Sequence, residues 1–232
     1  MSTKNLLLFG SSGNIGSKIK DTFLKQKYNV FCIKRSTENI ISKYDIYWDF
    51  VNNKEPDIKN SIIFDSICFA HGINTNDSIY DFDINISLDL YKTNCLSILF
   101  AINKLLKLNL LTKPSRICII SSIWQNIARQ NKMSYCISKS SLQGLINSLS
   151  IDLAQDGHLI NGLLPGALDT EMTRSNLTDN QLTILKAQTN FNRLANIKDV
   201  AELTYFLCSN LNTSITGQFI NIDLGFSNAK II

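Results

Sequence analysis

The stretch that decides the fold reads Leu6-Leu7-Leu8-Phe9-Gly10-Ser11-Ser12-Gly13-Asn14-Ile15-Gly16. Its apolar half predicts a buried strand at 6–9, and the residues that follow predict a helix near 14–27. Glycines let the backbone turn tightly and approach a ligand closely, and the first turn of a helix offers unpaired N–H groups to a phosphate. The stretch therefore predicts a strand–turn–helix unit that holds the pyrophosphate of a dinucleotide. A tight turn with a purely structural role is the alternative.

The rest of the chain repeats this alternation of short apolar runs and longer helical stretches. Further strands are predicted at residues 30–33, 46–48, 67–70, 117–121, 159–164 and 219–223, and further helices near 84–108, 134–155 and 198–209. The connections around strands two to four are too short for more than a single helical turn. Such an order is typical of a parallel sheet covered on both faces. We predict one α/β domain over residues 1–232, with a doubly wound, seven-stranded parallel sheet and helices on both faces.

Composition argues against several classes of protein. The chain of 232 residues is long enough to bury a substantial core, and a net charge of +4 is too mild to indicate a nucleic-acid or membrane partner. No segment has the length of a membrane span, and the apolar run at 6–9 is too brief for a signal peptide. The six cysteines include no CxxC pair, so we expect buried free thiols, a cytoplasmic location and no metal site.

Two basic residues, Lys34 and Arg35, follow the second predicted strand. Dinucleotide-binding folds that select NAD carry an acidic residue at this place, which binds the ribose hydroxyls. A guanidinium can instead hold a 2′-phosphate through its forked donors, and a carboxylate would repel that group. The pair therefore favours NADP(H) as cofactor. A solvated basic turn without a ligand is the alternative.

A tyrosine and a lysine, Tyr135 and Lys139, stand four residues apart in a predicted helix, thirteen residues after Ser122. Their side chains project from the same helix face, because four residues make about one turn. A cation beside the phenol is expected to lower its pKa, so that the phenol can exchange a proton with a carbonyl or an alcohol near neutral pH. Ser122 would hold the reacting oxygen by a hydrogen bond. Taken alone, the Tyr/Lys pair is a weak signal, because chance gives roughly half a match in such a chain.

Taken together, these motifs resemble those of the short-chain dehydrogenase/reductase family over nearly the whole chain. The turn from Gly10 to Gly16 is similar to the family's TGxxxGxG motif. The other matching segments are Asp49 at the adenine-bonding position, Ala70-His71-Gly72 at the NNAG motif, Pro165-Gly166-Ala167-Leu168-Asp169-Thr170 at the PGxxxT segment, and Asp223-Leu224-Gly225 at the terminal DGG. The four catalytic positions are matched by Asn94, Ser122, Tyr135 and Lys139. Motifs in this order and spacing make chance an insufficient explanation for the Tyr/Lys pair.

The resemblance implies a Rossmann fold and an NADP(H)-dependent oxidoreductase that moves hydride between nicotinamide and a carbonyl or alcohol. It implies that Ser122 binds the carbonyl oxygen and that Tyr135 supplies the proton. Lys139 would lower the tyrosine pKa and bond the nicotinamide ribose, and Asn94 would hold a water that links Lys139 to solvent. The cofactor contacts that it implies are Gly10, Ser12, Gly13, Asn14, Ile15, Gly16, Lys34, Arg35, Asp49, Phe50, Ala70, Gly72, Asn94, Tyr135, Lys139, Pro165, Gly166, Leu168 and Thr170. It also suggests a homodimer or homotetramer joined through the 84–108 and 134–155 helices and the C-terminal segment.

Within the family, the chain is most similar to β-ketoacyl-acyl-carrier-protein reductases. This similarity suggests a small-molecule carbonyl substrate, either a 3-oxoacyl thioester, free or carrier-linked, or a similar ketone. It is clearest from Pro165 onward, through Met172-Thr173-Arg174, a lid-like helix at 179–188, Arg193-Leu194 and Ile215-Thr216-Gly217.

Three positions depart from the family pattern. Asn14 replaces the middle glycine of the first motif, and asparagine tolerates left-handed backbone, so we expect the turn to persist. His71 enters the NNAG site, where a structural role beside the cofactor is favoured over that of a base. Of the two arginines with which the carrier-protein reductases dock their partner, Arg116 matches one, but Asp156 stands at the other. The reversed charge weakens the case for an acidic carrier protein.

The substrate side of the site leaves several interpretations open. Trp124, Gln125, Arg129, Lys132 and Arg174 form either a pocket for an anionic substrate, such as a phosphopantetheine thioester or a sugar phosphate, or a set of solvated loop residues. A second enzyme interpretation is a sugar or nucleotide-sugar dehydrogenase/reductase of polysaccharide biosynthesis. An interpretation from another class is a non-catalytic nicotinamide-binding regulator. Its usual mark is a broken catalytic set, and here all four positions are filled.

Overall fold

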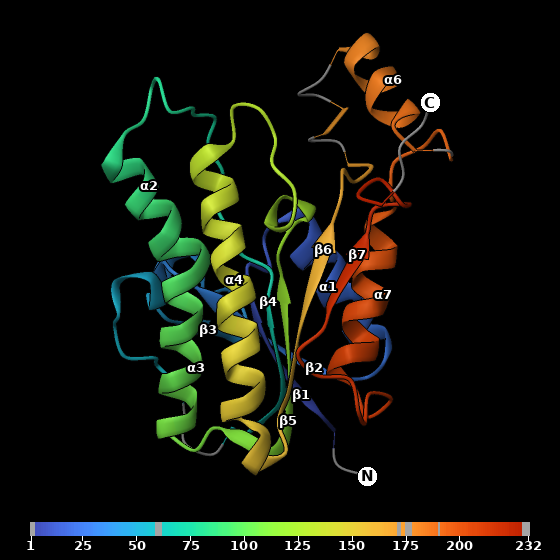
Figure 1. Cartoon of the computed structure of the whole chain (residues 1–232). Helices are drawn as coiled ribbons and strands as arrows, with labels where there is room; N and C mark the ends of the chain where they lie inside the picture. Colours follow the sequence, from blue (N-terminus) through green and yellow to red (C-terminus); the bar gives the residue numbers. More distant parts are fainter. Residues whose placement is uncertain (1–2, 59–61, 171–172, 175–177, 190, 229–232) are drawn as a thin grey trace.

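The computed structural model describes residues 3–58, 62–170, 173–174, 178–189 and 191–228. Seven parallel strands form one sheet in the order β3-β2-β1-β4-β5-β6-β7 (Figure 1). The strands are β1 (Asn5–Phe9), β2 (Asn29–Lys34), β3 (Asp45–Tyr47), β4 (Phe64–Phe69), β5 (Leu111–Ile120), β6 (Leu159–Pro165) and β7 (Phe219–Ile222). The predicted seven-stranded parallel sheet is confirmed.

Helices cover both faces of this sheet. The helices are α1 (Asn14–Lys25), α2 (Ile84–Tyr91), α3 (Ser97–Lys107), α4 (Met133–Asp152), α6 (Asp179–Ala187) and α7 (Ile197–Cys208), of which α6 lies beyond the end of the sheet (Figure 1). Because side chains alternate along a strand, Leu7 and Phe9 of β1 enter the core under α3 and α4, while Leu6 and Leu8 enter the core under α1 and α7 (Figure 1). All four side chains are fully buried. The predicted doubly wound arrangement is confirmed.

The strand order reverses between β1 and β4, at the middle of the sheet. In open α/β sheets, ligands bind outside the carboxyl ends of the strands at such a point. The two strand ends lie side by side there, and the Ala70 N–H donates to the Phe9 carbonyl at 3.0 Å. The topology therefore brings the glycine turn after β1 and the Ala70–Gly72 segment after β4 to one place.

Two elements differ from their predicted form. The helix predicted at 84–108 is α2 and α3 joined by a π-helical turn, η3 (Lys92–Leu96). β5 begins at Leu111 rather than at residue 117, and its pairing with β4 shifts register between Leu111 and Arg116. Pro114 lies inside this irregular part. A proline has no N–H to donate to a neighbouring strand, so its presence in the sequence argues against a strand at residues 111–116.

Three further expectations, on the short connections, the cysteines and the helix lengths, agree with the structure. In the described part of the chain, the connections around β2 to β4 hold only the short turns η1 (Thr37–Asn39) and η2 (Phe50–Asn52). All six cysteines are free thiols, and all but Cys136 are buried. None of the helices in the described ranges is long and apolar enough to cross a bilayer.

Candidate active site

The glycine turn leaves the first turn of α1 open to a ligand. Gly13 is the N-cap residue, its position makes no side-chain capping bond, and no acidic residue stands in the first turn. Unpaired N–H groups and the positive end of the helix dipole are therefore available to an anion. A Cβ on Gly16 would stand 2.1 Å from the Gly10 carbonyl oxygen, and one on Gly10, at φ +78°, would stand 2.5 Å from the His71 amide nitrogen. The turn keeps its shape only with glycine at positions 10 and 16.

The residues at the tip of this turn are accessible. Ser12, Gly13 and Asn14 are exposed, and Ile15 is half-buried. The turn persists with asparagine in it, as expected, but Asn14 is the first residue of α1 and does not use the left-handed backbone that asparagine tolerates. The middle glycine of the motif is not needed here, because any L-residue fits a right-handed helical position.

The two basic residues after β2 have different surroundings. Lys34 Nζ lies 3.8 Å from Asp45 Oδ1 and 3.5 Å from Ser11 Oγ, so its charge is partly balanced within the protein. Arg35 is exposed and makes no hydrogen bond or ion pair with any residue that the structure describes. Since the Lys34–Ser11 contact brings the end of β2 beside the glycine turn, Arg35 is a cation at this edge of the site that no described residue engages.

Asp49 and Phe50 follow β3 but differ in what they can offer. Asp49 accepts a hydrogen bond from Asn52 Nδ2 at 3.0 Å and lies 3.4 Å from Lys54 Nζ. Burial acts against the charged form, yet the hydrogen bonds from Asn52 and Lys54 lower the pKa of this carboxyl overall. Phe50 is buried, and its ring packs edge-on against the His71 ring at 4.7 Å. The Phe50 side chain therefore belongs to the core.

His71, which follows Ala70 at the NNAG site, is a neutral imidazole. Its Nε2 lies 3.1 Å from Ser97 Oγ, which donates to the Thr93 carbonyl at 2.7 Å. Burial, aided by the charges of Lys139 and Arg35, lowers the pKa of the imidazole to about 3. A group that binds no proton near pH 7 cannot return one to a substrate. The structure thus supports the packing role that the sequence favoured for His71.

Gly72, Asn94 and Lys139 converge beyond the end of β4. A Cβ on Gly72 would stand 3.2 Å from Asn94 Oδ1 and 3.6 Å from Lys139 Nζ. Asn94 lies buried in the π-turn η3, where its Oδ1 accepts from the Ile73 N–H at 2.8 Å. Its Nδ2 donates to the Ile73 carbonyl at 3.0 Å and to Ser138 Oγ at 2.9 Å. Both amide hydrogens thus have protein partners, so the water expected at Asn94 cannot accept from this side chain.

The π-turn and the two partners of Asn94 were missed in the sequence. Ile73 and Ser138 carry no motif of their own, and they meet Asn94 only in the folded chain. The π-turn has no sequence signature either, although such turns often mark functional positions in helices.

The pKa of Tyr135 overturns the expectation drawn from the sequence. Burial raises the pKa of the phenol to about 12, and a hydrogen bond with Ser122 opposes this rise. Lys139 Nζ lies 5.8 Å from the centre of the Tyr135 ring, and the ammonium is not among the causes of the shift. The expectation that Lys139 lowers the phenol pKa is therefore wrong in this structure. At neutral pH the phenol keeps its proton.

Lys139 and Ser122 complete the group around Tyr135. The Lys139 Nζ donates to the Ile120 carbonyl at 3.2 Å, and burial lowers its pKa to about 8. Ser122 is buried directly after β5, and its Oγ accepts from the Trp124 N–H at 3.3 Å. The end of β5 and the first two turns of α4 therefore bring Ser122, Tyr135 and Lys139 to one place.

The segment from Pro165 to Thr170 leads out of β6. Pro165 is the last residue of the strand, and the Gly166 N–H donates to the Ile222 carbonyl at 3.0 Å, which holds the turn against β7. Leu168 is buried and forms an isolated β-bridge with the segment after α6. Thr170 Oγ1 accepts from the backbone N–H of residue 173 at 3.1 Å. The lid-like helix is present as α6, whereas Met172 lies outside the described residues.

Two of the cations expected near the substrate are paired within the protein. Lys132 is buried, and its Nζ donates to Asn74 Oδ1 and to the Thr75 carbonyl, both at 2.9 Å. Arg174 makes a two-pronged ion pair with Asp169, at 2.7 and 2.8 Å. These pairs favour the interpretation of loop charges without an anionic ligand.

The other residues of this group pack against their neighbours. Gln125 is buried, and its Oε1 accepts from Ser121 Oγ at 2.8 Å. Trp124 meets the edge of the Phe226 ring at 6.1 Å, and the Arg129 guanidinium lies over the indole at 5.9 Å. Trp124 therefore packs between Arg129, in the loop after Ser122, and Phe226, in the C-terminal turn.

Arg116 and Asp156, which stand at the positions of the two carrier-docking arginines, both contact other residues of the protein. Arg116 Nε donates to the Asn212 carbonyl at 2.9 Å. Asp156 Oδ1 lies 2.9 Å from Lys113 Nζ, so the acidic residue neutralises the cation beside it. No basic patch forms from these described residues.

Comparison with known proteins assigns the family. Residues 59–227 match the family model described as enoyl-(acyl carrier protein) reductase. The chain belongs to the short-chain dehydrogenase/reductase family of oxidoreductases.

Relatives of this chain differ in the substrates that they are named for. The chain is 28% identical over 226 residues to the 3-oxoacyl-[acyl-carrier-protein] reductase of Buchnera aphidicola, covering 96% of this chain and 87% of that protein. It is also 28% identical over 242 residues to the L-rhamnose 1-dehydrogenase (NADP(+)) of Thermoplasma acidophilum, covering 96% and 95%. The structure of a short chain dehydrogenase family protein from Francisella tularensis has a TM-score of 0.85 and 26% identity, covering 98% and 100%. These relatives are oxidoreductases, but the two curated ones are named for different substrates.

Proposed function

We propose that this protein is an NADPH-dependent reductase of a ketone, most simply a 3-oxoacyl thioester, in which Tyr135 donates the proton. The observation that carries the proposal is the meeting of Ser122, Tyr135, Lys139 and Gly72 on the side of the sheet where the first turn of α1 is open. As a member of its family, the chain is an oxidoreductase that acts on CH–OH and C=O groups. The cofactor, the direction and the substrate are the finer parts of the proposal.

The residues around β1 and β2 fit the pyrophosphate and the 2′-phosphate of NADPH. The uncapped first turn of α1 offers N–H groups to the pyrophosphate, and the Arg35 guanidinium, which has no partner among the described residues, offers a fork to the 2′-phosphate. Lys34 contributes less, because Asp45 balances its charge. The relative from Thermoplasma acidophilum is named for NADP(+), which supports the same cofactor here. The contacts expected at Asp49, Ala70, and the segment from Pro165 to Thr170 belong to this proposal.

The catalytic residues then divide the work of reduction. NADPH, when bound, supplies the hydride that adds to the carbonyl carbon. Ser122 donates a hydrogen bond to the carbonyl oxygen and stabilises the negative charge that develops there. Tyr135 retains its proton at neutral pH, because burial raises its pKa to about 12, and transfers this proton to the same oxygen to give the alcohol. The Lys139 ammonium, whose pKa burial lowers to about 8, is acidic enough to return a proton to the phenolate so formed. A phenol that holds its proton suits reduction better than oxidation.

The substrate proposal rests on what surrounds the site. The paired state of Lys132 and Arg174 gives no support to an anionic substrate such as a sugar phosphate. The Lys113–Asp156 pair likewise gives none to carrier-protein docking, so a free thioester or a simple ketone is favoured. A sugar dehydrogenase is the second candidate, because the L-rhamnose 1-dehydrogenase relative is as similar as the acyl reductase.

A screen of NADPH consumption tests this proposal. The substrates compared are 3-oxoacyl thioesters, keto-sugars, simple ketones and an enoyl thioester, and the Tyr135→Phe protein is the blank. We expect turnover of the 3-oxoacyl thioester, lowered roughly 10²–10⁴-fold in Tyr135→Phe with NADPH affinity unchanged. Turnover confined to keto-sugars would replace the substrate by the second candidate. Tight NADPH binding without turnover of any substrate would favour the non-catalytic regulator.

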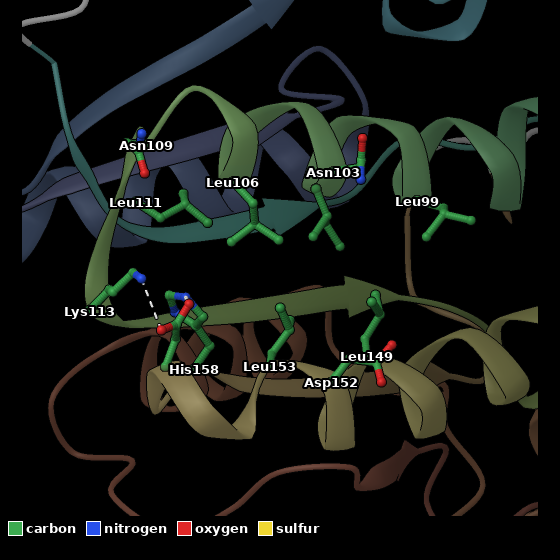
Figure 2. Close-up of a pocket in the computed structure, with 12 residues that line it drawn as sticks. Leu99, Asn103, Leu106, Asn109, Leu111, Lys113, Leu149, Asp152, Leu153 and His158 are labelled. Carbon is green, nitrogen blue, oxygen red and sulfur yellow. Dashed lines mark hydrogen bonds and ion pairs between the residues drawn. The ribbon is translucent and has the colours of Figure 1, made fainter.

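The assembly of the protein is part of the same proposal. α3 and α4 leave a groove of about 420 Å³ between them, and Figure 2 shows Leu99 and Leu106 of α3 opposite Leu149 of α4 and Leu153, which follows α4. Further exposed apolar side chains lie on α2, on η3 and on α4: Ile86, Leu88, Leu96, Ile137 and Ile151. A second copy of the chain would bury this surface in a homodimer or homotetramer. Size measurement by light scattering tests this, with Leu99→Glu expected to give monomers.

A further inference from the structure

The helix that carries Tyr135 begins without a cap of its own. α4 starts at Met133, and the N-cap residue, Lys132, makes no capping hydrogen bond with its side chain. Such a start leaves the backbone N–H groups of the first turn without intrahelical partners. Ser134 is 1% exposed, so its N–H cannot rely on water. It needs an acceptor within the protein.

Asp77 supplies that acceptor from 57 residues earlier in the chain. Its Oδ1 accepts from the Ser134 N–H at 3.0 Å, its Oδ2 accepts from Ser134 Oγ, and its carbonyl accepts from the Met133 N–H at 3.3 Å. The Asp77 residue is 6% exposed and stands at the positive end of the helix dipole, where a negative charge is stabilised. Asp77 therefore caps α4 from outside the helix.

The segment that carries Asp77 is also tied to the catalytic residues. We name residues 73–77 the strap. At its start, Ile73 exchanges two hydrogen bonds with the Asn94 side chain, at 2.8 and 3.0 Å. In its middle, Asn74 and the carbonyl of the next residue accept from Lys132 Nζ at 2.9 Å. The strap thus joins the π-turn to the first turn of α4, and Figure 1 shows the chain between β4 and α2 passing the upper end of α4.

We propose that Asp77 is a positioning residue, which through its bonds to Ser134 fixes the Tyr135 phenol relative to Ser122 and Lys139. This inference rests on the proposed function, because it takes Tyr135 as the proton donor. Misplacement of a reacting group by about 1 Å can lower a rate on the order of 10²-fold. Asp77 lies at the start of α4 and not at the glycine turn, so its loss lowers kcat and leaves NADPH affinity unchanged.

Asp77→Ala tests the proposal against two controls from the same loop. Asp83→Ala removes the cap of α2, because Asp83 accepts from the N–H groups of residues 85 and 86. Asp81→Ala removes a carboxylate that accepts from Ser78 on the surface. Each variant is assayed for ketone turnover with NADPH, for NADPH affinity by fluorescence, and for hydrogen exchange of its backbone amides.

We expect Asp77→Ala to lower kcat by at least about tenfold, with NADPH affinity within about twofold of wild type. Exchange at residues 133–138 speeds up in this variant alone. Asp77→Asn restores part of kcat, because its amide oxygen still accepts from the Ser134 N–H. Asp83→Ala speeds exchange in α2 only, and both controls keep the wild-type kcat.

Several results overturn the proposal. They are a wild-type kcat in Asp77→Ala, an equal loss in Asp83→Ala, or a loss in NADPH affinity in place of kcat. A wild-type protein that turns over no ketone contradicts the proposed function instead. In that case hydrogen exchange still tests whether Asp77 caps α4. Unchanged exchange at residues 133–138 in Asp77→Ala rejects this capping role, and faster exchange supports it.

Discussion

The two halves of the sheet differ in whether the polar groups at their ends are hydrogen-bonded within the protein. Around β1 and β2, the first turn of α1 has no capping side chain, and Arg35 is exposed without a partner in the described ranges. Around β4 and β5, Asn94, Asp77 and Lys132 are buried and hydrogen-bonded to their neighbours. Polar groups without a partner in the protein suit the binding of a large charged cofactor, because the phosphates of the cofactor can bind them. Reacting groups must be held by the protein, because a small substrate cannot order them.

The glycine turn offers the largest expected effect. Gly16→Ala places a Cβ 2.1 Å from the Gly10 carbonyl oxygen. The Gly10 oxygen is a backbone atom that cannot move aside like the end of a flexible side chain, so we expect a loss of about 3 kcal/mol in stability and no measurable NADPH binding. Urea unfolding and fluorescence titration measure the two quantities. Gly13→Ala is the matched control for stability, because its Cβ would meet only the Gly10 oxygen at 3.7 Å. Equal stability of the two variants would contradict the role given to this backbone contact.

Asn94→Ala tests the paired half. It leaves the part-buried N–H and carbonyl of Ile73 and the buried Ser138 hydroxyl without their Asn94 partners. We expect a loss of about 2–3 kcal/mol in the free energy of unfolding, together with a fall in kcat. Asn103→Ala, at an exposed site on α3, is the control and should change neither. A fully stable Asn94→Ala protein would show that the amide contacts do not hold the site together.

Arg35→Ala tests the open half. The guanidinium has no protein partner in the described ranges, so its removal should leave the fold stable. We expect NADPH affinity to fall about 10- to 100-fold, or about 1.5–3 kcal/mol, while NADH affinity changes little. Lys34→Ala should have a smaller effect, because Asp45 and Ser11 already engage that ammonium. The reverse order of effects would move the 2′-phosphate site to Lys34.

The smallest effect near neutral pH concerns acid stability. The pKa of His71 is about 3 in the folded chain and near 6.5 in the unfolded chain. Between these values the unfolded state binds the proton and the folded state does not, so stability falls as the pH drops below about 6.5. The slope from this group is at most about 1.4 kcal/mol per pH unit. Urea unfolding at several pH values should show a flatter dependence in His71→Ala, and an unchanged slope would indicate that His71 is protonated in the fold.

Much of the fold could be predicted because its signals are local. The apolar run before Gly10, the glycines that follow it, and the alternation of strands and helices are patterns within a few residues of each other. The start of β5 was missed because Pro114 argues against a strand, and only pairing with β4 reveals it. The π-turn at Asn94 was missed because the sequence around it is an ordinary helical pattern.

The site was predictable in its members but not in their chemistry. Tyr135 and Lys139 share a helix face, as their spacing requires, yet the sequence cannot tell how deeply the phenol is buried. Burial dominates its pKa, which reverses the expected direction. Hydrogen bonds between residues distant in the sequence could not be predicted either. An example is the bond from the Ser134 N–H to Asp77, which stands 57 residues earlier.

The protonation state of the Tyr135 phenol is the claim on which the proposed reduction depends. The difference in tyrosinate absorbance between wild type and Tyr135→Phe, followed over pH in the absence of cofactor, measures it directly. We predict no difference between about pH 7 and pH 10, because the phenol keeps its proton throughout this range. A phenolate that forms near neutral pH, and is absent from Tyr135→Phe, would contradict the account.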